Sequence, residues 1–358
     1  MKTSFISSLS IQTTMRYAVS RAQQDMVAAQ QEVTTGRHAD VGVALGATTS
    51  RSLDLTRDIL RIKSTLTTNS LATQRLESSE EALGKMSDLA QDIMNALITL
   101  GDTKDVTNIG IFQTAVRTSL DMFVGFGNTS VNGEYLFAGI NSDVVPFQDI
   151  MSPTSGARTV LEDELNLFLA AQGTTKDQMS TAQMDAFLTQ MDGIFDGTLP
   201  LTSSGDDFWS THVSNASDAN MKSRISQSEV VEASTNANVK GMRDFVLAAF
   251  ISEMFIDTET SDEGRKAAIA RSTSYIGSAK TQGIDQERAK LGLAAERVKK
   301  ADESLEAQRN IVETHLNDLE SVDAYEASTR VKGLEALIET AYTLTARLQQ
   351  LSLVNFLR

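Results

Sequence analysis

Apolar residues recur at alternating intervals of three and four positions near the start of the chain. The recurring positions are Met15, Val19, Ala22, Met26, Ala29 and Val33. This period places the apolar side chains on one face of a helix and predicts a helix over residues 15–33. Gly36 interrupts the pattern, and Gly42 and Gly46 follow it, so a loop is expected there.

A longer segment with the same spacing predicts a second helix over residues 55–100. Its apolar positions are Leu55, Ile59, Ile62 and Leu66, followed by Leu83, Met86, Ala90, Ile93, Leu97 and Leu100. The pair Gly101-Asp102 is typical of a helix C-terminus. A third helix is expected over residues 109–126.

The C-terminal segment has a more regular repeat. One apolar residue falls in every seven, at Ile284, Leu291, Val298, Leu305, Val312 and Leu319. The register shifts over residues 323–327, and the pattern resumes at Leu334, Leu337, Ala341, Leu344, Leu348 and Leu351. A seven-residue repeat gives a helix one narrow apolar seam and favours left-handed supercoiling against a partner.

All three prolines, Pro146, Pro153 and Pro200, lie in the middle of the chain. Proline is excluded from helix interiors, so two helical arms are expected around a different middle segment. That segment combines turn residues with two short amphipathic helices, over 161–171 and 181–195, and a strand is expected to begin within 224–231. We interpret it as a small inserted α+β domain.

The predicted fold class is mainly α: a long antiparallel helical bundle or coiled coil made by the two arms. Three parts are expected. Residues 1–37 and 326–358 form terminal coiled-coil helices that are disordered in the free chain, residues 38–145 and 236–325 form a helical rod, and residues 146–235 form the insert. An ordinary bundle within one chain accounts for the rod, whereas the terminal helices are expected to order only among several copies.

Two sets of residues follow from these patterns. The expected assembly seam consists of Met15, Val19, Ala22, Met26, Val33, Leu334, Leu337, Ala341, Leu344, Leu348 and Leu351. The expected rod core consists of Leu55, Ile59, Ile62, Leu66, Leu291, Val298, Leu305 and Val312.

Composition and motifs argue against catalysis and nucleic-acid binding. The net charge is −15, which repels phosphates and favours solubility before assembly, and the chain has no cysteine. The three histidines, His38, His212 and His315, show no ligand spacing, and no nucleophile elbow, phosphate-binding loop or dinucleotide motif is present. No apolar run is long enough for a secretory signal or a membrane span. We therefore expect no enzyme activity, no cofactor, no metal and no membrane insertion.

Several strings resemble the flagellin superfamily, whose terminal helices pair inside a tubular filament. They are residues 31–37 (QEVTTGR), 234–238 (STNAN), 323–327 (DAYEA) and 343–353 (TLTARLQQLSL). Residues 133–139 (GEYLFAG), followed by Pro146-Phe147, resemble the hook-associated group of the superfamily, at the exit from the helical domain into its insert. The expected insert junction is therefore Tyr135, Phe137, Gly139 and Pro146. The chain departs from flagellin at Asp40-Val41-Gly42, where flagellins carry Asp-Asp-Ala-Ala-Gly.

The resemblance implies a structural subunit of the bacterial flagellum that joins the hook to the filament and templates flagellin polymerisation. Implied partners are further copies in a ring, a hook-associated protein on the hook side, flagellin on the filament side, and an export chaperone on the C-terminal helix. It also implies an extracellular location, reached through the flagellar type III apparatus without a cleaved signal peptide. Bulk flagellin, a non-flagellar coiled-coil interaction module and an enzyme hidden in residues 146–235 remain alternatives.

Overall fold

The structure is a computed structural model, which describes residues 8–101, 103–150 and 155–356. The chain divides into two compact units. We call residues 1–64 and 305–358 the terminal unit, and residues 65–304 the central unit. The helices dominate both units, and the strands are confined to two small hairpins, which confirms the predicted fold class.

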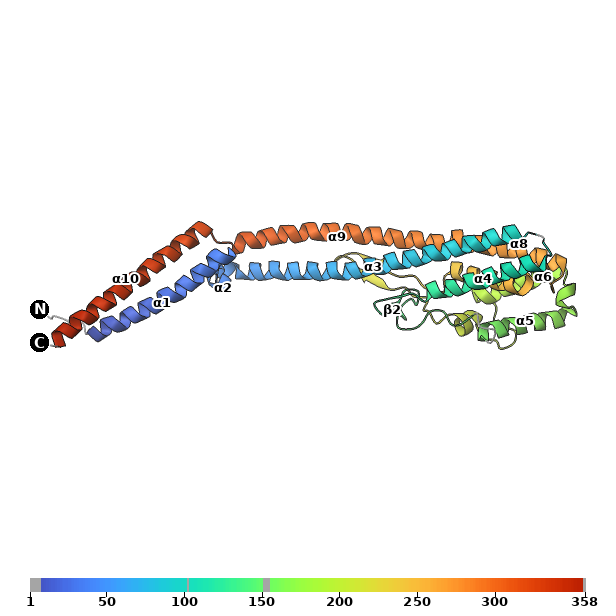
Figure 1. Ribbon diagram of the computed structural model, residues 1–358, viewed down its shortest axis with the longest axis horizontal. Coiled ribbons are helices and arrows are strands. Elements are labelled where there is room, and N and C mark those ends of the chain that lie inside the picture. Colours follow the sequence, from blue (N-terminus) through green and yellow to red (C-terminus); the bar gives the residue numbers. More distant parts are fainter. Residues whose placement is uncertain (1–7, 102, 151–154, 357–358) are drawn as a thin grey trace. The chain divides into compact units, whose positions relative to one another are not determined.

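The terminal unit contains the two ends of the chain as paired helices. Figure 1 shows the C-terminal helix lying alongside the N-terminal one. The unit is built from α1 (Ser8–Thr35), α2 (Val41–Leu45), the short 3-10 helix η1 (Gly46–Thr48), the first part of α3 (Thr49–Leu100), the last part of α9 (Asp285–Glu320) and α10 (Ala324–Phe356).

Local sequence explains where these helices begin and end. Gly36, with φ of +70°, follows α1 and adopts the left-handed conformation that glycine tolerates best. The Asp40 carboxylate accepts a hydrogen bond of 3.0 Å from the Val43 backbone N–H and caps α2. Asp323 accepts one of 2.8 Å from the Tyr325 N–H at the start of α10. The predicted loop after Gly36 thus contains the short helix α2 and the 3-10 turn η1.

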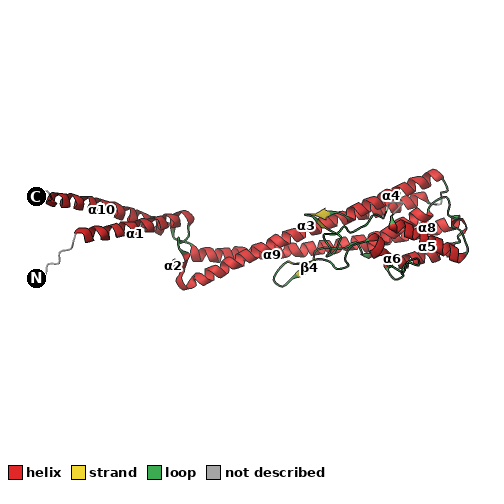
Figure 2. Ribbon diagram, turned by 90° about the horizontal axis from the view of Figure 1, so that it is seen from below, coloured by secondary structure: helices red, strands yellow, loops and turns green. Residues whose placement is uncertain are grey.

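The central unit packs several shorter helices against the long ones (Figure 2). The helices are α4 (Val106–Gly127), α5 (Gly156–Gln172), the 3-10 helix η2 (Lys176–Gln178), α6 (Thr181–Asp196), the π-helical turn η3 (Trp209–Val213), α7 (Lys240–Phe255), α8 (Asp262–Ser278) and the π-helical turn η4 (Ala279–Ile284). Aromatic contacts mark the core, where the rings of Phe123 and Phe245 stack with centroids 3.9 Å apart.

Two antiparallel hairpins complete the central unit. The first joins β1 (Ser130–Val131) to β2 (Glu134–Tyr135) through Asn132 and Gly133, which both have positive φ, as an Asn-Gly hairpin turn requires. The second joins β3 (Lys222–Arg224) to β4 (Val230–Glu232). The strand expected to begin within 224–231 is therefore two short strands with a turn between them.

The middle segment shares its hydrophobic core with the helices on either side of it in sequence. Leu161, Phe187 and Trp209 belong to the same buried cluster as Phe123 of α4 and Phe245 of α7. The middle segment therefore has no separate hydrophobic core, and the division of the chain into three parts at residues 146 and 235 remains a prediction. Among the described residues, no helix is both long enough and apolar enough to cross a membrane.

Candidate assembly surface

One face of α1 packs on one face of α10 within the terminal unit. Ala22 and Ala29 are buried on α1, and Ala327 is buried on α10. Met15 and Thr345 meet at 3.9 Å, and the Gln23 amide donates a hydrogen bond of 3.0 Å to the Tyr342 hydroxyl. Residue numbers rise along α1 as they fall along α10, so the two helices are antiparallel. Alanine at the buried positions lets the helix backbones approach closely.

The structure distributes the predicted seam residues over two faces. Met15, Val19, Met26, Leu334 and Ala341 are partly covered, and Ala22 is buried. Three others point to solvent: Val33 is 41% exposed, Leu337 50% and Leu344 44%. The side chains of Leu348 and Leu351 lie outside the described residues. Sequence spacing did not separate the faces, because both fit an alternation of three and four.

The exposed leucines of α10 line an apolar groove of about 430 Å³, together with Met15, Ala336, Thr340 and Ala341. We call Leu337, Leu344 and this groove the outer stripe. Tyr17 and Val27 of α1 are also exposed, at 74% and 61%. Single exposed apolar residues are common on protein surfaces, but a continuous apolar groove indicates a contact surface.

The predicted rod core lies on the facing sides of α3 and α9. In the terminal unit Ile59, Ile62 and Leu305 are buried, and Leu55 and Val312 are partly covered. In the central unit, Leu291 and Val298 are buried and Leu66 is partly covered. The α9 residues of the seven-residue repeat are therefore buried or partly covered.

The predicted insert junction joins the two ends of the middle segment. The Ala237 N–H donates a hydrogen bond of 2.8 Å to the Phe137 carbonyl, and an isolated antiparallel bridge joins Ala138 to Asn236, so the exit and return segments lie side by side. Phe137 and Pro146 are buried, and Tyr135 is partly covered. Gly139 has φ of +64°, and a β-carbon there would lie 2.6 Å from the Ala219 carbonyl oxygen. Only glycine fits this close approach.

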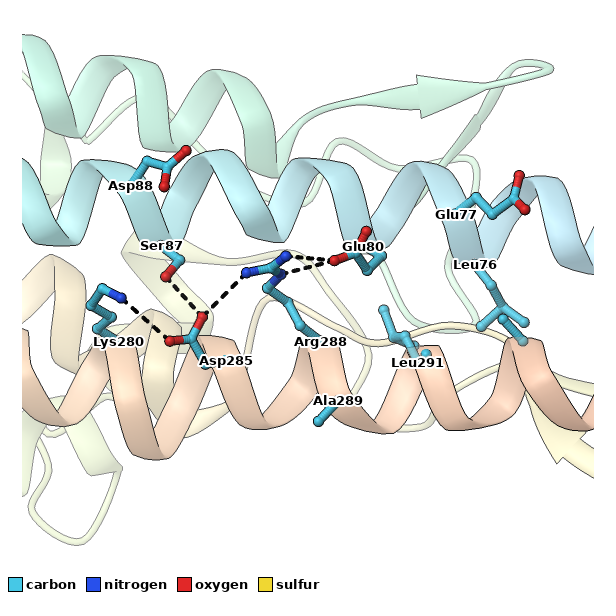
Figure 3. A pocket seen from close by; sticks show the side chains of 12 residues that line it. Leu76, Glu77, Glu80, Ser87, Asp88, Lys280, Asp285, Arg288, Ala289 and Leu291 are labelled. Carbon is cyan, nitrogen blue, oxygen red and sulfur yellow. Dashed lines mark hydrogen bonds and ion pairs between the residues drawn. The ribbon is translucent and has the colours of Figure 1, made fainter.

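A second hollow, of about 580 Å³, lies between α3, η4 and α9 in the central unit (Figure 3). The Arg288 guanidinium donates to Glu80 Oε1 at 2.6 and 3.1 Å and lies 3.5 Å from Asp285 Oδ1. Ser87 donates to Asp285 at 2.8 Å, and Lys280 lies 3.5 Å from the same carboxylate.

These charges brace α3 against α9. The hydrogen bond to Glu80 raises the pKa of Arg288 above its usual value. Its guanidinium is charged at every physiological pH, as that of any arginine is. Both basic groups lining the hollow are occupied by carboxylates, and no histidine or cysteine lines it. Across the residues that the structure describes, no group of three potential metal ligands comes together. The charged side chains around the hollow therefore link α3 to α9 and η4.

The two helical arms match models of known protein families. Residues 6–142 match the bacterial flagellin N-terminal helical region, and residues 273–357 match the bacterial flagellin C-terminal helical region. These two matched regions contain α1 and α10, the helices that carry the candidate surface.

A solved structure assigned to a flagellar hook-associated protein from Vibrio parahaemolyticus is similar in fold. The match has a TM-score of 0.51 and 11% sequence identity, and it covers 76% of this chain and 97% of that chain. At this identity the likeness concerns the fold alone. No curated protein sequence matches the chain.

Proposed function

The chain belongs to the flagellin family, whose members are structural subunits of the flagellum, and from this premise we propose that it joins the hook to the filament. In this proposal copies form a ring and contact one another through the outer stripe of α10. The ring then presents a surface on which flagellin polymerises. Family membership also fits a structural role without catalysis.

The outer stripe is the observation that carries the proposal. Leu337 and Leu344 remain about half exposed after α1 and α10 have paired, and they flank an apolar groove. A fully buried aliphatic side chain contributes roughly 1.5–3 kcal/mol, so a neighbour that covers these two adds roughly half of that for each. A ring repeats this contact at every interface, so modest pairwise gains accumulate.

Joining the hook to the filament is proposed on two further grounds. The GEYLFAG string at residues 133–139 resembles the hook-associated group, and the structure builds it into the paired exit and return of the middle segment. The similarity in fold to the hook-associated structure is consistent with this assignment. The proposed partners are a hook-associated protein on one side and flagellin on the other.

Export also belongs to the proposal. We propose passage through the flagellar type III apparatus, with a chaperone covering α10 in the cytosol. The physical reason is the outer stripe, because an uncovered apolar groove promotes association before export.

Sedimentation velocity tests the assembly surface. We expect concentration-dependent oligomers of the parent protein and their loss in the variant Leu337→Ser/Leu344→Ser, with the central unit still folded. Leu293→Ser is the matched control, because Leu293 is a 65% exposed leucine of α9 in the central unit. Equal association of all three proteins would contradict the proposal.

The bulk filament subunit is the second candidate, because both matching family models describe flagellin regions. Abundance separates the two roles. A joining subunit forms a trace component of sheared flagella, whereas a bulk subunit dominates them. Quantitative mass spectrometry of purified flagella measures this ratio directly.

A further inference from the structure

The terminal unit consists of two helical arms, an N-terminal one (α1 to α3) and a C-terminal one (α9 and α10). Each arm is interrupted by a short non-helical segment, and the two interruptions lie beside each other. α1 ends at Thr35 just before the loop to α2, and α9 ends at Glu320 just before α10. Two backbone hydrogen bonds tie the breaks together and form an antiparallel bridge between Arg37 and Ser321. His38 N–H donates to the Glu320 carbonyl at 3.0 Å, and Val322 N–H donates to the Gly36 carbonyl at 3.0 Å.

Two buried glutamates lie at these interruptions, Glu32 in the N-terminal arm and Glu320 in the C-terminal arm. Glu32 is 8% exposed and accepts from Arg330 at 3.1 Å and from the Ala39 N–H at 3.2 Å. Glu320 is 7% exposed and accepts from Arg37 at 3.1 Å and from the Ser52 hydroxyl at 2.5 Å. Each carboxylate is therefore paired with an arginine from the other helical arm. We call these contacts the carboxylate latch.

Apolar packing alone does not fix how α1 pairs with α10. Ala22 and Ala29 repeat at seven residues on α1, as Ala327, Leu334 and Ala341 do on α10. A slide of one repeat moves a helix by about 10 Å and again places apolar residues opposite apolar residues. Polar groups at single positions set register in such pairs, because a shifted arrangement leaves a buried charge without its partner.

We propose that Glu32 and Glu320 are positioning residues that fix the register and rotation of α1 against α10. The latch thereby determines which residues of α1 lie beside Leu337 and Leu344 in the outer stripe. Its consequence for assembly rests on the proposed function, whereas the register is measured within one chain. A slide of one repeat moves Leu337 and Leu344 by about 10 Å relative to Met15, which completes the groove, and leaves the helices formed.

Distance measurement between two spin labels tests the register. Because the chain has no cysteine, Gln24→Cys and Glu339→Cys provide the two labelling sites, both exposed and both away from the latch. Labelled protein is diluted in excess unlabelled protein, so that pulsed electron paramagnetic resonance reports distances within single chains. We expect one narrow distribution for the parent protein at a total concentration at which the copies associate and the terminal helices are ordered.

The variant Glu32→Gln/Glu320→Gln should broaden this distribution or shift it to a longer distance, because a seven-residue slide displaces one helix by about 10 Å along its axis. Glu326→Gln is the matched control, since Glu326 also pairs with Arg330 at 3.1 Å, but within α10. It should leave the distribution unchanged. A third test leaves Glu320 unchanged and reverses the other ion pair. Glu32→Arg alone should broaden the distribution, and the double change Glu32→Arg/Arg330→Glu should restore a narrow one.

An unchanged narrow distribution in Glu32→Gln/Glu320→Gln would overturn the latch, as would a broad distribution in the parent protein. Sedimentation of the same samples reports association separately. A latch variant with altered register and unchanged oligomers would therefore contradict the proposed assembly surface while supporting the latch.

Discussion

Gly241 of α7 and Gly283 of the π-helical turn η4 lie in backbone contact. A β-carbon on Gly241 would lie 2.6 Å from the Gly283 α-carbon and 2.8 Å from the Ile284 nitrogen. Backbone atoms cannot move aside as a flexible side chain does, so two chain segments cross here only because both residues lack a side chain. This crossing holds α7 against the segment that leads into α9.

Gly283→Ala should therefore destabilise the central unit by about 3 kcal/mol, the upper range for overpacking a tight core. Urea unfolding followed by the fluorescence of Trp209, which is buried, measures the change. Gly292→Ala is the control, because Gly292 lies in α9 with no neighbour within 4 Å of an added β-carbon. There alanine should stabilise by about 0.5–1 kcal/mol through helix propensity. Equal effects of the two changes would refute the crossing.

Acid should lower the stability of the fold by protonating Asp257, which lies in the loop after α7. Burial opposes ionisation of its carboxyl, but hydrogen bonds from Lys176 and Thr260 outweigh burial and lower its pKa below the usual value. A lowered pKa stabilises the fold at neutral pH, and this contribution is lost as the pH falls through the folded pKa. Asp257→Asn should cost roughly 1–3 kcal/mol at about pH 7 and progressively less below about pH 4.

Urea unfolding between these pH values, monitored through Trp209, provides the measurement. The exposed Asp163 of α5 supplies a control, Asp163→Asn, for which little change is expected at either end of the range. A destabilisation by Asp257→Asn that is the same at acid and neutral pH would show that the carboxylate charge is not responsible.

Salt should strengthen self-association. The central unit carries 34 acidic and 19 basic residues, whereas the terminal unit carries 13 of each, so the net charge of −15 belongs to the central unit. Copies that dock through the terminal unit bring like-charged central units together. Raising NaCl from about 10 mM to about 150 mM shortens the screening length from about 30 Å to about 8 Å and weakens this repulsion. Light scattering that falls with added salt would contradict this reasoning.

The ends of the chain should be the first part to yield to a protease in dilute solution. Of the described α1 side chains, only Ala22, Ala29 and Glu32 are buried, so a two-helix pair gains little from ordering. Limited proteolysis at low concentration should trim both ends and leave a resistant fragment near residues 40–325. Mass spectrometry locates the cuts, and protection of both ends at the lowest concentration would contradict this prediction.

The long helices could be predicted because their apolar spacing is regular over many turns. The repeat predicts a single covered face of α9, and Leu291, Val298 and Leu305 are buried. The two short helices expected over residues 161–171 and 181–195 lie within α5 and α6.

Contacts between distant residues could not be predicted in this way. The pairs Glu32–Arg330 and Arg37–Glu320 join opposite ends of the chain, and no local pattern marks either glutamate as buried. The π-helical turn η4 follows α8 without a proline, so its sequence gives no sign of altered hydrogen bonding. The division of the predicted seam residues between a covered and an exposed face could not be predicted for the same reason. Spacing shows which residues share a helical face, but it does not show which neighbour covers that face.

The distribution of flagellin in a strain that lacks this protein tests the proposed function most directly. Quantitative immunoblotting of the culture medium and of the cell-attached fraction gives the measurement. We predict that flagellin is exported but accumulates in the medium as unpolymerised subunits, while the cells carry hooks without filaments. Attached filaments of normal length in that strain would contradict the account.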